Sequence, residues 1–256
     1  MTGDEPKSLD DLLSKVNELR KKASREDELP KTFTALRPKT DDEEEAKDLF
    51  CRRAVVLKGL ISVDKRIKSA TFENYDAKLD GQKKAVKICK LFADRFGQRY
   101  QNGKNVEIGL FLVGDYGTGK SHLASAVLNR MDQLGYPGLY IDAVDLFDYI
   151  NSKNLPLPLP EIIQKLSQIA VLVIDELGVQ SWSKAEQKRL QQIFDTRIKF
   201  RLPTILCTNL SQAELADCCG GRVLSRIAEN TYTVKFEWED HRRANSPSRK
   251  PVDEVF

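Results

Sequence analysis

The chain has 256 residues with 41% hydrophobic content, which is enough for one substantial core and a smaller appendage. Lys and Arg total 41 against 38 Asp and Glu, so the net charge of +3 does not by itself indicate a nucleic-acid-binding protein. No stretch approaches the roughly 18 apolar residues of a membrane span. The N-terminus also lacks the basic and apolar regions of a signal peptide, so the sequence predicts a cytoplasmic protein. The five cysteines include no pair at zinc-ligand spacing, which disfavours a zinc or disulfide framework.

Residues 1–40 predict a small helical arm followed by a linker. Ser8 and Asp11 form a capping-box pattern at the start of a helix. One apolar stripe follows at helical spacing, made of Leu9, Leu12, Leu13, Val16 and Leu19. The rest of this helix is charged, so the stripe requires a partner surface, and the proline-containing stretch up to residue 40 is typical of a linker.

A second helix is predicted over residues 41–66, between the arm and the main domain. The acidic run 41–45 lies in its first turn, where negative charge suits the helix dipole, and Gly59 is a candidate C-cap. The main domain is predicted to span residues 67–243, and the short polar segment 244–256 is predicted to be a disordered tail.

Apolar runs of strand length alternate with helical patterns in the predicted main domain. The runs occupy residues 108–113, 138–142, 171–175, 203–209 and 232–236. Strands that read as continuous apolar runs are buried on both faces, and helices between them favour parallel pairing. The sequence therefore predicts an α/β domain with a parallel sheet flanked by helices.

The segment 114–121 matches the phosphate-binding pattern G-x-x-x-x-G-K-[ST] and lies between a predicted strand and a predicted helix. Its glycines allow a tight turn in which backbone N–H groups converge on phosphate oxygens, helped by the positive end of the helix. Lys120 is predicted to contact the β- and γ-phosphates of ATP, while Ser121 ligates Mg²⁺, and ADP is the product that remains after hydrolysis. The predicted nucleotide-binding residues are Gly114, Asp115, Tyr116, Gly117, Thr118, Gly119, Lys120, Ser121 and His122.

Two carboxylates, Asp175 and Glu176, end the apolar run 171–175. Ligand chemistry in parallel sheets lies at the carboxyl ends of the strands. Asp175 is suited to hold Mg²⁺ through water, and Glu176 to orient and deprotonate the water that attacks ATP. Asn209 is a further polar residue at a predicted strand end. The sequence therefore predicts ATP hydrolysis.

Two arginines, Arg222 and Arg226, are four positions apart (i and i+4) and so share one face of a predicted helix. Two interpretations remain open. The pair is either an ordinary solvated surface or a pair of cations presented to a neighbouring subunit.

Several motifs resemble the DnaC helicase loaders, which share their ATPase domain with the IstB transposition helpers. The resemblance covers about residues 59–243, and its narrower motifs extend beyond the generic phosphate loop. The matching segments are ATFENY (70–75), LVGDYGTGKSHLASAV (112–127), LVIDELGVQ (172–180), CTNL (207–210), GGRVLSRI (220–227) and FEWEDHR (236–242).

The resemblance implies a five-stranded AAA+ P-loop core without the usual C-terminal helical lid. It implies that Asn209 positions the attacking water or contacts the γ-phosphate, that Arg222 and Arg226 complete the site of the next subunit, and that Arg242 senses the nucleotide state. It also implies a nucleotide-dependent oligomer and an N-terminal region that grips the replicative helicase, a DnaB-like hexamer.

In this family an added helix before the 171–175 strand contacts single-stranded DNA. Phe147 and Tyr149 are candidate stacking residues here, and Lys153 is a candidate phosphate contact. The alternative is that Phe147 belongs to the core and that Tyr149 is only partly exposed.

The resulting hypothesis is an ATPase, weak and regulated by DNA and its partner, that loads the replicative helicase onto single-stranded DNA during initiation or restart of replication. Three other functions remain open. They are an IstB-like helper that acts with a transposase on double-stranded DNA, a small-molecule phosphotransferase, and an ATP-regulated adapter with negligible turnover.

Overall fold

The computed structural model describes residues 69–101, 109–178 and 182–240. The chain divides into two units, Met1–Leu36 and Arg37–Phe256, and every described residue belongs to the second. The predicted arm with its apolar stripe, the helix over 41–66, Arg242 and the tail over 244–256 lie outside the described residues.

Five parallel strands form a single sheet in the order β2-β3-β4-β1-β5, which confirms the predicted fold class. The strand that precedes the phosphate loop, β1, therefore lies between β4 and β5, which are the last two strands along the chain. The strands are β1 (Gly109–Gly114), β2 (Gly138–Asp142), β3 (Val171–Asp175), β4 (Thr204–Thr208) and β5 (Thr231–Phe236). All residues of β3 and β4 are buried, as their continuous apolar runs predict.

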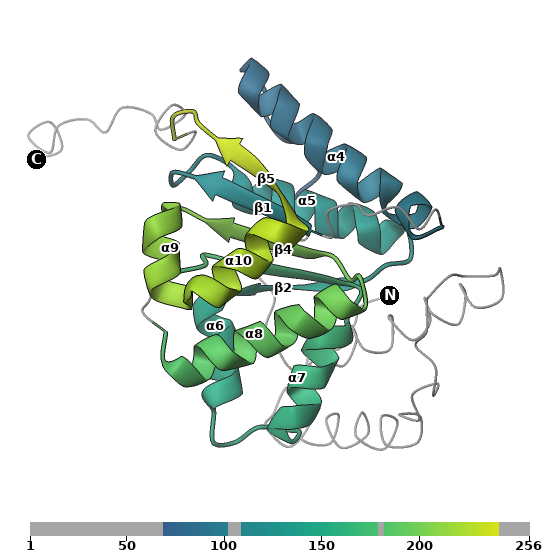
Figure 1. Ribbon diagram of the computed structural model, residues 1–256. Helices are drawn as coiled ribbons and strands as arrows, with labels where there is room; N and C mark the ends of the chain where they lie inside the picture. Colours follow the sequence, from purple (N-terminus) through teal and green to yellow (C-terminus); the bar gives the residue numbers. More distant parts are fainter. Residues whose placement is uncertain (1–68, 102–108, 179–181, 241–256) are drawn as a thin grey trace, which may run out of the picture. The chain divides into compact units, whose positions relative to one another are not determined.

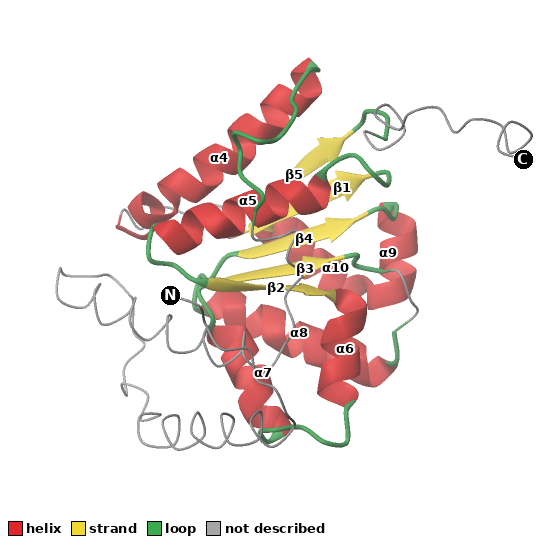
Figure 2. Cartoon of the chain, turned by 180° about the vertical axis from the view of Figure 1, so that it is seen from behind, coloured by secondary structure: helices red, strands yellow, loops and turns green. Residues whose placement is uncertain are grey.

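Helices cover both faces of the sheet (Figures 1 and 2). One face carries α4 (Asp80–Gln101) and α5 (Lys120–Gln133). The other carries α6 (Ala143–Asn151), α7 (Leu159–Gln168), α8 (Lys184–Lys199), α9 (Gln212–Cys219) and α10 (Gly221–Asn230). None of the described helices is long and apolar enough to cross a membrane.

The strand period of two divides the core into two clusters, one on each face. Along β3, Leu172 and Ile174 belong to the cluster with α6 to α10, whereas Val171 and Val173 belong to the cluster with α4 and α5. Asp175 follows Val171 and Val173 at the same spacing of two residues. Its side chain therefore lies on the face that α5 covers, beside the phosphate loop.

Each covering helix has an apolar stripe that matches this arrangement. In α4 the buried positions Ala85, Cys89, Phe92 and Ala93 follow the helical repeat. Helices α8 and α9 both begin with a complete capping box, Ser183 with Glu186 and Ser211 with Glu214.

Candidate nucleotide-binding site

A cavity of about 300 Å³ opens at the carboxyl ends of β1, β3 and β4. It brings together three predicted groups that are far apart in the sequence: the phosphate loop, the acidic pair and Asn209. Its lining consists of Asn74, Tyr75, Asp76, Gln82, Tyr116, Gly117, Thr118, Gly119, Lys120, Ser121, His122, Asp175, Glu176, Thr208 and Asn209. The predicted Gly114 and Asp115 do not line it, although both accept a hydrogen bond from Lys120, which does.

The phosphate loop presents the free end of a helix to this cavity. Helix α5 begins after Gly119 with no side chain capping its first N–H groups, so these donors are available to an anionic ligand. The Lys120 ammonium folds back onto the loop and donates to the carbonyl oxygens of Gly114 and Asp115 at 2.6 and 2.7 Å. These neutral acceptors bind an ammonium more weakly than phosphate oxygens do.

Two aromatic side chains hold the loop from the other side. The Tyr75 hydroxyl and the Trp238 indole N–H both donate to the carbonyl oxygen of Thr118, at 3.1 and 2.9 Å. Gly119 lies beneath Tyr75 with a φ of 94°, and a Cβ there would come within 2.6 Å of the tyrosine ring. Only glycine therefore fits this position, and the loop conformation is fixed by residues from both ends of the described chain.

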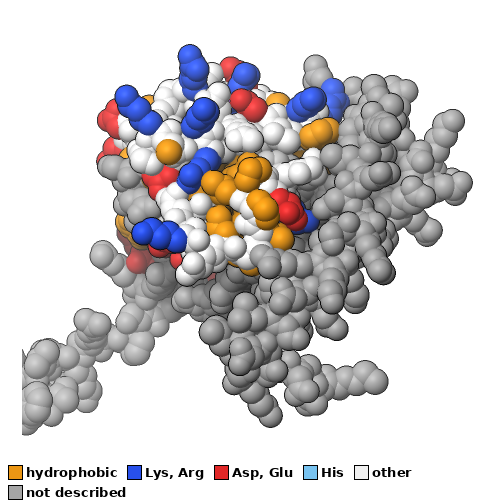
Figure 3. All heavy atoms as spheres, turned by 90° about the horizontal axis from the view of Figure 1, so that it is seen from below, with side chains coloured by type: hydrophobic (Ala, Val, Ile, Leu, Met, Phe, Trp, Pro, Cys, Tyr) orange, Lys and Arg blue, Asp and Glu red, His pale blue; other side chains and the backbone are white. Residues whose placement is uncertain are grey.

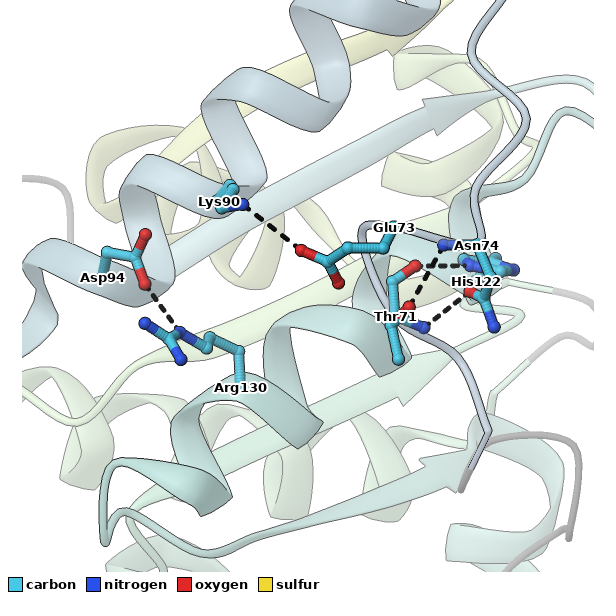
Figure 4. A network of polar contacts seen from close by, with 7 residues as sticks. All are labelled: Thr71, Glu73, Asn74, Lys90, Asp94, His122 and Arg130. Atoms are coloured by element: carbon cyan, nitrogen blue, oxygen red, sulfur yellow. Dashed lines mark hydrogen bonds and ion pairs between the residues drawn. The ribbon is translucent and has the colours of Figure 1, made fainter.

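The segment of Tyr75 is itself anchored to α4 and α5 (Figure 4). The backbone N–H of Thr71 donates to the Asn74 side chain at 2.8 Å, and the backbone N–H of Asn74 donates to the Thr71 hydroxyl at 3.1 Å. His122 Nε2 donates to the Thr71 carbonyl at 2.9 Å, and its ring lies edge-on to that of Tyr75. Glu73 pairs with Lys90 at 3.3 Å. His122 is therefore a link between α5 and this segment as well as part of the cavity wall.

The two residues of the acidic pair differ in exposure and in backbone conformation. Asp175 is 4% exposed, and its Oδ1 accepts the backbone N–H of Glu176 at 2.8 Å. Glu176 is exposed and has a left-handed φ of 52°, which costs a non-glycine residue about 1 kcal/mol or more. Conformations of this kind occur often at functional sites.

The end of β4 is tied to the acidic pair by short bonds. The Thr208 hydroxyl donates to the Leu177 carbonyl at 2.7 Å, and the Leu177 N–H donates to the Cys207 carbonyl at 2.9 Å. Asn209 follows directly and lines the cavity. Its position next to Glu176 in the cavity wall agrees with a role in handling water or the terminal phosphate.

A magnesium ion fits this set of groups only as a partner of a bound nucleotide. Among the described residues no cluster of three or more His, Cys, Asp or Glu side chains could hold a metal. Ser121 and Asp175 nevertheless line the same cavity. Mg²⁺ commonly takes one or two protein oxygens and completes its shell with phosphates and water.

Arg222 and Arg226 share an exposed face of α10, as the spacing predicts, and neither lines the cavity of its own chain. Arg226 pairs with Asp195 of α8 at 3.2 Å and with Glu229 at 3.5 Å. Helix α10 lies on the sheet face opposite to α5 (Figure 1). Both arginines are therefore available to another molecule.

The prediction that Phe147 stacks on DNA bases is wrong. Its side chain is 1% exposed and packs against Trp182, with ring centroids 4.9 Å apart, because the apolar face of α6 points into the core. Tyr149 is partly buried, and burial raises the pKa of its hydroxyl to about 12. Lys153 is exposed. Seen from below the view of Figure 1, the surface also carries a hydrophobic patch that is bordered by both basic and acidic side chains (Figure 3).

The sequence prediction missed several residues of the site. Asn74, Tyr75, Asp76, Gln82 and Thr208 line the cavity, and Tyr140 of β2 contacts one of the predicted carboxylates. Its hydroxyl donates to Asp175 Oδ2. Nothing in an apolar run such as residues 138–142 distinguishes a functional tyrosine from a core aromatic. The register that places Tyr140 opposite Val173 and near Asp175 is known only once the strand order is known.

The family described as "IstB-like ATP binding protein" matches residues 9–245. The chain belongs to this family. Within it, the chain is 32% identical over 177 residues to the replicative helicase loader DnaC of Escherichia coli (strain K12), covering 68% of this chain and 69% of that protein. The DnaC of Buchnera aphidicola subsp. Schizaphis graminum is also 32% identical, over 180 residues.

Solved structures agree with the membership in the IstB-like family. The crystal structure of the DnaC helicase loader superposes with a TM-score of 0.57 at 26% identity and covers 68% of this chain and 100% of its own. The DnaI structure gives a TM-score of 0.59 at 23% identity, with 68% and 95% covered, which shows a shared fold. The cavity therefore lies in a protein of the AAA+ P-loop fold and of an ATP-binding family.

Proposed function

We propose that this protein is an ATP-dependent loader of a replicative DNA helicase onto single-stranded DNA. The observation that carries the proposal is the single cavity that unites the phosphate loop, Asp175 with Glu176, and Asn209. The 32% identity to DnaC proteins points to helicase loading as the use of this site.

In the proposed site, positively charged groups and backbone N–H donors surround the phosphates of ATP. Lys120 leaves the two loop carbonyls and binds the β- and γ-phosphates, while the first N–H groups of α5 bind the remaining phosphate oxygens. Ser121 and Asp175 would hold Mg²⁺, which would neutralise charge on the phosphates. Glu176 takes a proton from the attacking water, and Asn209 orients that water. Arg226 of a neighbouring copy stabilises the charge on the transferred phosphoryl group.

Substitution of Lys120 by alanine is expected to weaken ATP binding about 100-fold, since two charge-assisted hydrogen bonds to phosphate together contribute roughly 3 kcal/mol. Binding of a fluorescent ATP analogue measures this loss. Lys184→Ala is the matched control, because that lysine is exposed at the start of α8, outside the cavity. Thermal melting checks that both variants fold. An unchanged affinity in the Lys120 variant would contradict the nucleotide site.

Helicase binding is assigned to residues 1–40, with Leu9, Leu12, Leu13, Val16 and Leu19 as the contact stripe. We expect the full chain to bind a DnaB-type helicase, and Leu12→Glu to weaken this binding at least about 10-fold, since a charge at a buried anchor costs more than roughly 1.4 kcal/mol. Asn17→Glu introduces the same carboxylate off the stripe and is expected to bind normally. Pull-down and sedimentation with the helicase measure both.

The same experiment separates the helicase loader from its main rival. A protein that fails to bind helicase but binds double-stranded DNA and a transposase would be a transposition helper. Single-stranded DNA binding by the loader is assigned to the surface around Lys153, with Tyr149 as a neighbour whose ring is only partly accessible.

A further inference from the structure

Tyr140 is a buried phenol directed at the predicted metal ligands. Its side chain is 6% exposed, and β2 places it on the sheet face covered by α5. In the strand register Tyr140 lies opposite Val173, so Asp175 is two residues further along the same face of β3. A tyrosine spans that diagonal distance, and its hydroxyl donates to Asp175 Oδ2.

The Asp175 carboxylate is held from several sides at once. Its Oδ1 accepts the Glu176 N–H at 2.8 Å, and its Oδ2 accepts the Tyr140 hydroxyl. On the other neighbouring strand, β4, the register that pairs Ile174 with Leu206 brings the buried Cys207 beside Asp175. A carboxylate bound at both oxygens has its orientation fixed before any ligand arrives.

The phenol of β2 contacts Asp175 of β3, one of the two residues expected to meet Mg²⁺. The buried hydroxyl is bonded to this carboxylate, although a phenylalanine would fill the same apolar space.

We infer that Tyr140 is a positioning residue for the metal-nucleotide site: its hydroxyl holds the Asp175 carboxylate in place, so that Mg²⁺ shared with the phosphates would meet a ligand that is already oriented. This inference rests on the proposed nucleotide-binding function and adds to it a residue that orients one of the metal ligands. Tyr140 touches neither phosphate nor metal in this role, because it acts through Asp175.

The test is a Mg²⁺ titration of the binding of a fluorescent ATP analogue to the full chain, comparing wild type with Tyr140→Phe. Loss of a partner that orients a metal ligand is expected to raise the Mg²⁺ midpoint about 10-fold. Affinity measured in EDTA, where Lys120 and α5 act alone, should not change. Tyr232→Phe is the matched control, since that tyrosine is exposed on β5, and its midpoint should equal that of wild type.

Two outcomes overturn the inference. A Tyr140→Phe protein with a lower melting temperature but an unchanged Mg²⁺ midpoint would make the hydroxyl merely structural. An equal loss of affinity with and without Mg²⁺ would place the effect on the nucleotide and not on the metal. Should the phenylalanine variant fail to fold, Tyr140→Leu provides the same titration. Absence of nucleotide binding by wild type would instead refute the proposed function itself, which is a distinct result.

Discussion

Alanine at position 226 is expected to lower the ATP turnover of the assembled protein roughly 1000-fold, which is the lower range for loss of an arginine that completes a phosphoryl-transfer site. Nucleotide affinity should change little, because Arg226 does not line the cavity of its own chain. The fold should also persist. The Arg226 side chain is 49% exposed, and its ion pairs with Asp195 and Glu229 are surface contacts, typically worth about 1 kcal/mol or less. Phosphate release at saturating ATP measures the effect.

Complementation distinguishes a role in the neighbouring site from a local one. A mixture of Arg226→Ala and Lys120→Ala proteins contains interfaces with an intact phosphate loop on one side and an intact Arg226 on the other. Such a mixture should recover part of the turnover that each variant lacks alone. Arg130→Ala is the control, because Arg130 also forms a surface ion pair, with Asp94 at 2.7 Å, but on the opposite sheet face. If mixing restores nothing, the arginine does not act between subunits.

The sheet was predictable because each strand carries its own signal. The apolar runs 138–142 and 171–175 coincide with β2 and β3, and the other three runs differ from their strands by one residue at one or both ends. Strands buried on both faces need uninterrupted apolar side chains, and that requirement is visible without any tertiary information. The phosphate loop and acidic pair were predictable for a related reason: both lie at the junction of a strand with the next segment.

The contacts between distant segments were not predictable in this way. The sequence ATFENY gives no indication that Tyr75 would bond the carbonyl of Thr118, and nothing near Trp238 indicates that it would meet the same oxygen. Tyr140 reads as an ordinary strand aromatic until the pairing of β2 with β3 brings it near Asp175. These residues act through strand order and helix placement, which a local pattern does not encode.

Phe147 illustrates the opposite error, in which a local sequence pattern predicted a DNA contact for a residue that belongs to the core. Aromatic residues followed within a few positions by a lysine, as Phe147 and Tyr149 are by Lys153, are typical of a single-strand binding surface. In α6, however, Phe147 lies one residue after Leu146 and three before Ile150, and all three side chains point into the core. The helical repeat of buried residues is therefore a better guide here than residue type.

A buried arginine in α8 is expected to dominate the stability of the domain at the end of the sheet away from the nucleotide. Arg197 is 0% exposed and crosses from α8 to the end of α7 and to the segments that precede β3 and β4. Its guanidinium donates at 2.6–3.4 Å to Thr204 Oγ1 and to the carbonyl oxygens of Leu166, Ile169, Ala170 and Pro203. These acceptors are buried loop and helix-end groups that water cannot reach in the folded protein.

Substitution of Arg197 by methionine is expected to reduce the free energy of unfolding by about 3–5 kcal/mol, because methionine fills the space but leaves several buried carbonyls without a donor. The free energy of unfolding of Arg197→Lys should lie between those of wild type and Arg197→Met. An ammonium keeps the charge, but it has fewer N–H donors than the planar guanidinium. Arg189→Met on the same helix is the control. Arg189 bonds Asn151 at the surface, and its loss should cost about 0.5 kcal/mol or less. Urea unfolding followed by circular dichroism measures all three, and equal losses for Arg197→Met and Arg189→Met would show that the buried bonds contribute nothing.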